Sequence, residues 1–341
     1  MKTKTDKKHK HLIGKTNLND NNKEPAFIVP ERMIGVPGHL SPEAQAFLSM
    51  PRFAAHDRPA LDDKAGWKKM IAESEAVILS YLAGRKFTPS AITERREGDA
   101  LAYEIVPDGV STDDRRVYLD IHGGALIMGG GEVCKIMAQV PATLHDCRVV
   151  AVDYRMPPDH PYPTGLDDCM TIYRALLKEH AVADIVIGGG SAGGNLVAAT
   201  ILRARDEGLP LPAAAVLISP ELDLTESGDS FQTNAGIDPM GSLMQVNLLY
   251  ANGADLSHPY LSPLLGDFAK GFPPTIITAG TRDLFLSNAV RMHRKLRGMG
   301  VPAELHILEA APHGAFAERS PEEASVGDEI RAFARRWWGK R

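Results

Sequence analysis

Cysteine is scarce in this chain of 341 residues, and the three positions where it occurs argue against the common cysteine-based architectures. Cys134, Cys147 and Cys169 form an odd set with no CxxC spacing. Disulfide frameworks and zinc sites usually show paired spacings of that kind. We therefore expect three buried, reduced thiols, no metal site and no cofactor.

Long apolar runs are also missing. No stretch approaches the ~18 apolar residues that a membrane helix needs, and the N-terminus lacks the apolar core and cleavage site of a secretory signal. The formal net charge is −5, and the basic residues are interspersed with acidic ones instead of forming a stripe for nucleic acid. These absences predict a cytoplasmic protein with neither a membrane nor a nucleic-acid partner.

Composition divides the chain into a tail, an early helical segment and a large α/β region. Residues 1–25 are rich in Lys, Asn, Asp and Thr without hydrophobic rhythm, which predicts a disordered tail. Residues 26–90 are predicted to contain two helices, at 42–48 and at about 63–82, before any strand of the main sheet. Residues 91–341 are predicted to form the main domain.

Beyond residue 90, apolar runs of strand length alternate with amphipathic stretches, as parallel βαβ units require. The first two strands show the alternation of an antiparallel edge pair. The fold class is therefore α/β, a mostly parallel sheet flanked by helices, with a long irregular insertion at about 220–272 that is a candidate lid. The predicted strands are 93–96, 100–106, 117–121, 149–152, 185–187, 214–218, 275–278 and 304–308, and the predicted helices are 166–179, 192–205, 242–250, 288–298 and 321–338.

The sequence Gly189-Gly190-Ser191-Ala192-Gly193 lies between a predicted strand and a predicted helix. In a sharp strand-to-helix turn the residue at the apex projects its side chain, and glycines two positions away avoid a clash with the turn. A glycine-rich turn that binds phosphate is the alternative, but no lysine follows as in a P-loop. We therefore predict that Ser191 is a nucleophile, which needs a base to take its proton.

Candidates for the base and its acid follow later strands. His313 comes just after the last predicted strand, at the edge of the sheet where Ser191 also lies, so it is the predicted base. Asp283 is the favoured acid because it lies close to a strand end and gives the chain order Ser, Asp, His. Asp223 remains an alternative, since the preceding strand can also supply an acid.

A glycine-rich turn after the third predicted strand supplies candidate donors for a developing oxyanion. The backbone N–H groups of Gly124 and Ala125, with that of Ala192, are predicted to form an oxyanion hole. His122 and Gly123 are expected to hold this turn in shape, with the His122 ring structural and not catalytic.

Three sequence blocks in order resemble the hormone-sensitive-lipase family of α/β-hydrolases. They are HGG at 122–124, DYRMPPDHPYP at 153–163 and GSAGGNL at 190–196. The likeness covers roughly residues 40–338 and implies an α/β-hydrolase fold with an N-terminal helical cap over the site. It also implies supporting roles for Asp153 and Arg155, and a homodimer.

Within that family the chain is most similar to bacterial monoterpene ε-lactone hydrolases and related esterases, through residues 41–45 and 280–284. It departs from the family pattern at three places. Gly190 replaces the usual Asp before the nucleophile, which removes a bracing carboxylate. Ala125 replaces the third glycine of the oxyanion turn but keeps the backbone N–H. The usual Asp-Pro-x-x-Asp setting of the acid is here Gly280 to Asp283.

The predicted function is hydrolysis of small carboxylic esters or lactones through an acyl-enzyme on Ser191. A short-chain acetylesterase or arylesterase would use the same residues and is the main alternative. A non-catalytic small-molecule receptor on the same fold is the other; the plant gibberellin receptors, which resemble this family, have lost the histidine that is present here as His313. Leu284, Phe285 and Met240 are candidates for an apolar wall of the substrate pocket.

Overall fold

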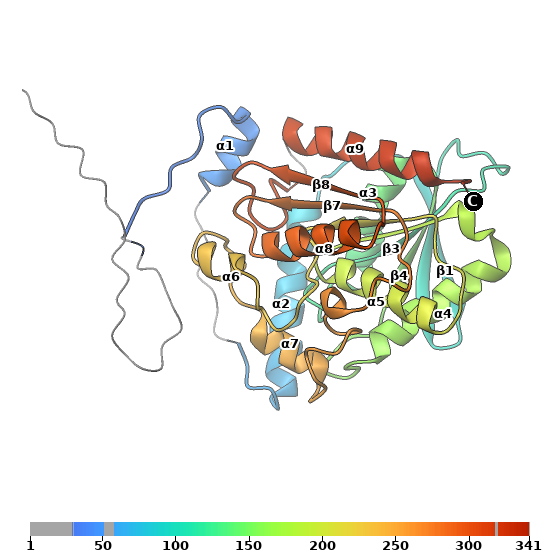
Figure 1. Cartoon of the computed structure of the whole chain (residues 1–341), viewed down its shortest axis with the longest axis horizontal. Helices are drawn as coiled ribbons and strands as arrows, with labels where there is room; N and C mark the ends of the chain where they lie inside the picture. The colour runs from blue at the N-terminus through green and yellow to red at the C-terminus, as the bar shows by residue number, and fades with distance from the viewer. Residues whose placement is uncertain (1–28, 30, 51–57, 318–319, 341) are drawn as a thin grey trace, which may run out of the picture.

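The computed structural model describes residues 29, 31–50, 58–317 and 320–340. The predicted disordered tail at residues 1–25 lies outside them. Within the described ranges the chain forms one eight-stranded sheet with helices on both faces (Figure 1). The elements in chain order are α1 (Pro42–Leu48), α2 (Lys64–Leu82), β1 (Ser90–Glu97), β2 (Ala100–Pro107), β3 (Val117–Ile121), α3 (Glu132–His145), β4 (Arg148–Asp153), α4 (Thr164–Glu179), η1 (Val182–Asp184), β5 (Ile185–Gly190), α5 (Ala192–Asp206), β6 (Ala214–Ile218), α6 (Ser230–Thr233), α7 (Met244–Ala251), η2 (Pro263–Leu265), β7 (Thr275–Gly280), α8 (Leu286–Gly298), β8 (Ala303–Leu308) and α9 (Pro321–Trp337).

The strand order across the sheet is β1-β2-β4-β3-β5-β6-β7-β8. β1 pairs antiparallel with β2, and β2 pairs antiparallel with β4. From β4 to β8 every neighbouring pair is parallel. The predicted α/β class, a mostly parallel sheet with an antiparallel edge pair, is confirmed. Among the helices of the described ranges, none combines the length and apolar composition that crossing a bilayer demands.

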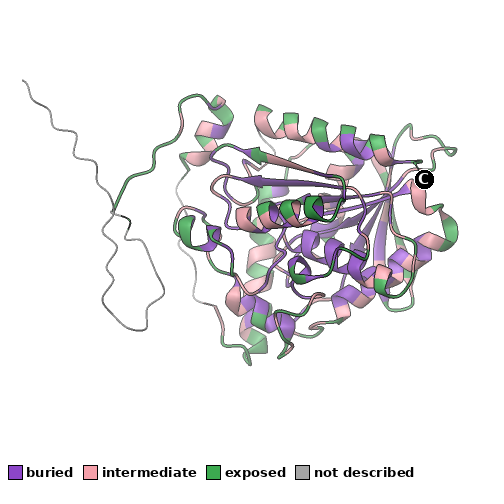
Figure 2. Ribbon diagram, viewed as in Figure 1, coloured by how far each residue is buried: buried purple, intermediate pink, exposed green. Residues whose placement is uncertain are grey.

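The central strands are buried on both faces, so alternate residues belong to two separate cores. In β3, Val117 and Leu119 pack in the core that also contains side chains of α4, α5 and α8. Tyr118, between them, packs in the core shared with α3 and α9. Figure 2 shows the resulting pattern of a buried sheet with exposed outer helix faces. A fully buried side chain of this size stabilises the fold by roughly 1.5–3 kcal/mol, so the sheet is a firm base for the loops at its edge.

Helix α3 is absent from the sequence prediction, and its composition shows why. Pro141 lies inside it, and a proline removes one helical hydrogen bond and normally ends a helix. The helix forms nevertheless, because Cys134, Ala138 and Ala142 bury one of its faces against the sheet. Tertiary packing therefore overrides the local signal here.

The segment between β6 and β7 is the irregular insertion that the sequence predicted. Its main helix, α7, was predicted at 242–250 and is observed at Met244–Ala251, and the short α6 was not predicted. Side chains of the insertion, including Phe231 and Val246, belong to the same buried apolar cluster as Trp67 of α2. Helix α2 and the insertion thus share one apolar cluster, whereas the interpretation of α1 and α2 as a cap stays a prediction.

Candidate active site

Ser191 lies at the apex of the turn between β5 and α5, with a positive φ of 55°. A Cβ atom on Gly189 would approach the carbonyl oxygen of Ile121 to 2.4 Å, and one on Gly193 would approach it to 1.9 Å. Both positions therefore require glycine, because the turn packs directly against the end of β3. Gly190 is different, since its Cβ would meet nothing closer than 3.6 Å.

The structure brings Ser191, His313 and Asp283 together from the carboxyl ends of β5, β8 and β7. Ser191 Oγ lies 2.9 Å from His313 Nε2, and His313 Nδ1 lies 3.3 Å from Asp283 Oδ1. The same Asp283 oxygen accepts a hydrogen bond from the N–H of Phe285 at 2.8 Å. A hydroxyl, an imidazole and a carboxylate in this order have the arrangement of a nucleophile, its base and the group that orients the base.

The pKa values of His313 and Asp283 shift in opposite directions. Burial lowers the pKa of His313, but the charge and hydrogen bond of Asp283, with help from more distant carboxylates, raise it by more, so the net shift is upward. Burial raises the pKa of Asp283, and the charge of His313 together with several hydrogen bonds brings it below its ordinary value. The lowered pKa favours the ionised form of Asp283, and this carboxylate in turn favours the protonated form of the His313 imidazole.

Asp223, the alternative acid, belongs to another network. Its Oδ2 pairs with Arg291 Nη1 at 2.8 Å and accepts a hydrogen bond from Ser227. Its Oδ1 accepts from Thr225. These partners occupy its carboxylate, which leaves Asp283 as the acid hydrogen-bonded to His313.

The predicted oxyanion turn adopts an unusual backbone. Gly124 has a φ of 120°, and a Cβ atom there would lie 2.0 Å from the carbonyl oxygen of Met128, so glycine is required. Ala125 has a φ of 53°, in the left-handed region that costs a residue with a Cβ roughly 1 kcal/mol or more. Replacing the family's third glycine by alanine therefore keeps the N–H donor but adds backbone strain, which the sequence alone did not reveal.

The oxyanion turn lies against the nucleophile. A Cβ built on Gly123 would be 3.4 Å from Ser191 Cβ. Within the described part of the chain, the N–H groups of Gly124 and Ala125 donate to no acceptor. Ala192 begins α5, and the first N–H groups of a helix have no partner inside the helix. The three predicted donors are thus available on elements that flank Ser191.

His122 and Asp153 brace the two ends of this turn. His122 Nδ1 lies 2.7 Å from the carbonyl oxygen of Gly123, and its ring stacks on Tyr154 with centroids 4.1 Å apart. Both carboxylate oxygens of Asp153 accept the N–H of Gly131 at 3.1 Å. These contacts place both residues against the turn, and the supporting roles expected of His122 and Asp153 stay predictions.

Arg155 acts further from Ser191. Its backbone N–H and its guanidinium both donate to the buried carboxylate of Asp168, at 2.9 and 2.8 Å. The pair joins the loop after β4 to α4 and so holds the segment in which Asp153 lies.

Asp238 is a site residue that the sequence analysis missed. Its Oδ2 accepts the N–H of His313 at 3.0 Å and the N–H of Leu284 at 2.9 Å. One carboxylate therefore joins the loop that carries the base to the loop that carries the acid. Asn234 adds a bond to the carbonyl oxygen of Asp283 at 2.9 Å. Both residues lie in the irregular insertion, where no strand or periodic pattern indicated a role.

Glu221 is a second residue that the sequence analysis missed. It follows β6, its N–H donates to the carbonyl oxygen of Ser191 at 3.1 Å, and its side chain is only 1% exposed. Neither carboxylate oxygen has a hydrogen-bond partner of normal geometry among the described residues, although the Asn247 amide lies beside it. Burial raises the pKa of Glu221 to about 7, and its charge acts on His313.

The replacement Glu221→Gln is expected to stabilise the protein above neutral pH. The pKa of Glu221 is raised in the folded state, so folding is penalised increasingly as the pH rises from the ordinary value of 4.5 through about 7. Removing the charge should increase the free energy of unfolding by about 3 kcal/mol at about pH 8 and by much less at about pH 5. Urea unfolding at the two pH values measures the difference.

The exposed residue Glu94 offers a control for that measurement, because its side chain is 59% exposed. We expect Glu94→Gln to change stability little at either pH. A Glu221→Gln protein that is less stable than the wild type at the higher pH would show that the carboxylate has a stabilising partner.

An apolar cluster lies beside His313. Leu284, Phe285 and Met240, the predicted wall residues, all belong to it, together with Trp67 of α2 and Ala125 of the oxyanion turn. The ring of Phe285 lies edge-on to the His313 ring, with centroids 4.9 Å apart. Phe285 thus lies against the base and shares one cluster with Leu284 and Met240, whereas the contact of these residues with a substrate stays a prediction.

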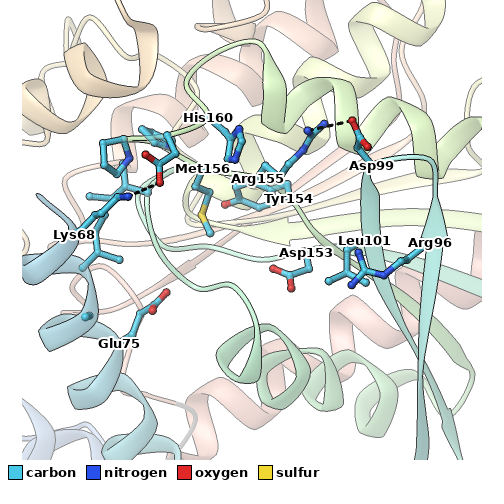
Figure 3. A pocket seen from close by; sticks show the side chains of 16 residues that line it. Lys68, Glu75, Arg96, Asp99, Leu101, Asp153, Tyr154, Arg155, Met156 and His160 are labelled. Atoms are coloured by element: carbon cyan, nitrogen blue, oxygen red, sulfur yellow. Dashed lines mark ion pairs between the residues drawn. The ribbon is translucent and has the colours of Figure 1, made fainter. Parts of the chain in front are cut away.

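A cavity of about 550 Å³ opens between α2 and the loop after β4 (Figure 3). Ile127 of the oxyanion turn and Asp153 line it, and Lys68 pairs with Asp159 at its rim at 2.7 Å. Glu75 of α2, which also lines the cavity, accepts the N–H of Gly129 at 2.8 Å. The cavity therefore reaches the back of the oxyanion turn.

Comparison with known proteins assigns the family. Residues 118–317, more than half of the chain, match a protein family that is described as having the α/β hydrolase fold. The matched span contains Ser191, Asp283 and His313. The chain belongs to this α/β-hydrolase family. Its resemblance to the hormone-sensitive-lipase family is confirmed as well: the crystal structure of an esterase from the bacterial hormone-sensitive-lipase family matches with a TM-score of 0.73 and 30% identity, over 88% of this chain and 99% of that one.

Other relatives of this α/β-hydrolase are esterases by name. The crystal structure of esterase E25 matches with a TM-score of 0.82 and 33% identity, over 92% of this chain and 99% of that chain. An acetyl-hydrolase of Streptomyces hygroscopicus is 32% identical over 193 residues, which are 55% of this chain and 64% of that protein. Esterase LipU of Mycobacterium tuberculosis is 31% identical over 245 residues, 68% of this chain and 82% of LipU. The match to the acetyl-hydrolase thus spans less than two thirds of that relative.

Proposed function

We propose that this α/β-hydrolase cleaves small carboxylic esters or lactones through an acyl-enzyme on Ser191. The observation that carries the proposal is the 2.9 Å contact between Ser191 Oγ and His313 Nε2, with Asp283 on the other ring nitrogen. A hydroxyl in that contact can pass its proton to the imidazole as it attacks a carbonyl carbon.

The reaction has two halves. In the first, Ser191 Oγ bonds to the ester carbonyl carbon while His313 takes its proton, and the N–H groups of Gly124, Ala125 and Ala192 hold the oxyanion. The carbon–oxygen bond to the alcohol then breaks, and His313 donates the proton to the leaving oxygen. In the second half, His313 takes a proton from water as the water oxygen bonds to the acyl carbon; the bond from that carbon to Ser191 Oγ then breaks, and His313 returns the proton to Oγ. For a lactone, the alcohol and the acid remain in one hydroxy-acid product.

The names of the relatives and the apolar cluster support a small, uncharged substrate. One relative is named an acetyl-hydrolase, and an arylesterase of Saccharolobus solfataricus is 28% identical over 200 residues. These two names support short-chain acetylesterase or arylesterase activity as the alternative, which would use the same catalytic residues. Lactone hydrolysis and the homodimer rest on the sequence resemblance and stay predictions.

Labelling of the nucleophile tests the mechanism. A related esterase, EstE5, was crystallised with phenylmethylsulfonyl fluoride, a reagent that sulfonylates reactive serines. We expect this reagent to abolish hydrolysis of p-nitrophenyl acetate and to add one sulfonyl group to the peptide that contains Ser191. Ser257→Ala, a change in an exposed loop, should be labelled like the wild type. A label on another residue, with Ser191 unmodified, would overturn the mechanism.

A substrate panel separates the remaining alternatives. Purified protein is given p-nitrophenyl acetate, butyrate and octanoate, and ε-caprolactone. Turnover of the lactone together with the short esters would support the lactone proposal, and turnover of the short esters alone would support the acetylesterase or arylesterase. Binding without any turnover would favour the receptor.

A further inference from the structure

His122, Cys134 and Asp153 meet beside the oxyanion turn although they belong to three different elements. His122 follows β3, Cys134 lies in the first turn of α3, and Asp153 ends β4. One potential ligand atom from each residue, a nitrogen, a sulfur and an oxygen, lies within 4.8 Å of the other two. No spacing in the sequence reveals this cluster, because the fold alone brings the three residues together.

The hydrogen bonding of the His122 ring leaves one of its nitrogens available to a ligand. Nδ1 lies 2.7 Å from the carbonyl oxygen of Gly123, which can only accept, so Nδ1 carries the proton and Nε2 has a free lone pair. Nε2 is buried and has no hydrogen-bond partner among the described residues. Metal-binding histidines are typically fixed by such a bond from their other nitrogen to a backbone carbonyl.

Cys134 and Asp153 also have lone pairs that could bind a metal ion. The sulfur of Cys134 makes only a long contact, 3.8 Å, to the carbonyl oxygen of Val152. Asp153 accepts from Gly131 and from the hydroxyl of Tyr103 at 3.0 Å, and each carboxylate oxygen has more than one lone pair.

We propose that His122, Cys134 and Asp153 form a zinc-binding site, with the fourth ligand position open to water. An imidazole nitrogen, a thiolate and a carboxylate are all zinc ligands, and zinc takes four ligands in a tetrahedron at about 2.0–2.3 Å. The three ligand atoms need to approach one another by on the order of 1 Å to reach that geometry. Binding converts the Cys134 thiol to a zinc thiolate and releases one proton to water.

The cavity of about 550 Å³ reaches one of the three proposed ligands, Asp153. Asp153 lines the cavity, and Figure 3 shows it among the charged side chains that surround the opening. Glu75 and Asp99 line the same cavity together with Lys68, Arg96 and Arg155, so its lining carries charges of both signs. Cys134 and His122 are buried and are not among the residues that line the cavity, so an ion that enters from the cavity would meet Asp153 first.

Zinc at this site is expected to inhibit the proposed esterase, because two of the ligands also brace the oxyanion turn. His122 directly precedes Gly123, and Asp153 binds the N–H of Gly131 at the other end of the turn. A displacement of about 1 Å in groups that position a reaction can reduce its rate about 10²-fold. We therefore expect kcat to fall between about tenfold and a hundredfold at saturating zinc, with KM changed far less. The inhibition rests on the proposed function, whereas the binding does not.

Titration of the full chain tests the site. The protein is freed of metal with EDTA and titrated with zinc sulfate, and binding, proton release, thermal unfolding and p-nitrophenyl acetate hydrolysis are followed. We expect one zinc ion per chain, release of a proton, a higher Tm because zinc binds the folded state, and inhibition that EDTA reverses. Cobalt in place of zinc should give the near-ultraviolet absorption of a thiolate–cobalt bond.

Two cysteine variants decide between this site and others. Cys134→Ser should weaken zinc binding at least about 10-fold and remove the thiolate–cobalt absorption, as loss of one ligand predicts. Cys147→Ser, which changes another fully buried cysteine outside the cluster, should bind zinc as the wild type does. Equal zinc affinity in the wild type and Cys134→Ser would overturn the proposal and point to another ligand such as His313. Absence of zinc binding to a protein that hydrolyses esters would overturn the zinc site alone and leave the proposed function intact.

Discussion

Replacing Ser191 by alanine is expected to lower kcat/KM for p-nitrophenyl acetate by about 10⁴- to 10⁶-fold. The change removes the oxygen that lies 2.9 Å from His313 Nε2, so no acyl-enzyme can form. The oxyanion turn and the apolar cluster would remain, and they can support only a slow attack by water. Initial rates at several substrate concentrations measure the loss of activity. Mass spectra of the intact protein after mixing with substrate show whether the acyl adduct is lost.

The fold of this variant should be unaffected, because the alanine keeps the Cβ atom and the strained turn. Its Tm is expected to stay within a few degrees of the wild-type value, as for most substitutions that remove one exposed or half-buried polar atom. If the Ser191→Ala protein is folded and retains more than about a tenth of wild-type turnover, Ser191 is not the nucleophile, since an acyl-enzyme mechanism on this residue allows no such residual rate.

Replacing Asp283 by asparagine is expected to reduce kcat by about 10³- to 10⁴-fold. The asparagine amide cannot stabilise the imidazolium and can hold His313 in the wrong tautomer. Because the Asp283 carboxylate raises the pKa of His313, the variant should also show a lower pKa for the base. In the wild type, activity falls as the pH drops through the raised pKa of His313, and in the variant this acid limb should move to lower pH.

Asp223→Asn is the matched control for that experiment. It removes the same charge from a carboxylate that is also fully buried, but one that pairs with Arg291. We expect lower stability, because a partly buried ion pair is broken, and turnover per folded molecule within a few-fold of the wild type. A larger loss of kcat in Asp223→Asn than in Asp283→Asn, with both proteins folded, would transfer the role of the acid to Asp223.

Much of the fold could be predicted from the sequence, because buried parallel strands leave a strong local signal. The eight observed strands overlap the eight predicted runs, and the antiparallel pair β1 and β2 was indicated by alternation. Helix α3 shows the limit, since it contains Pro141 and forms through burial of one face against the sheet, which the sequence pattern does not display. Inside the insertion, α7 was approximately predicted whereas α6, a helix of four residues, was not.

Part of the candidate site was predictable for a geometric reason. Ser191, Asp283 and His313 each follow a parallel strand, and parallel strands place their carboxyl ends at one edge of the sheet. Asp238 and Glu221 gave no such signal, because their roles depend on which loop folds over which. The sequence analysis did not anticipate that His122, Cys134 and Asp153 would lie close together, since cysteine spacing indicates only sites built from residues near one another in the chain.

Ser191, Ala125 and Leu126 have a positive φ, and the rest of the molecule must supply the energy that holds them in this strained backbone. Each of these residues carries a Cβ and raises the energy of the native state by roughly 1–2 kcal/mol, while a whole domain is usually stable by only about 5–15 kcal/mol. Neither of the two turns that contain these residues would keep this backbone as an isolated peptide. The two cores on either side of the sheet hold both turns in this conformation. We therefore expect mutations that loosen those distant cores to lower kcat before they unfold the chain.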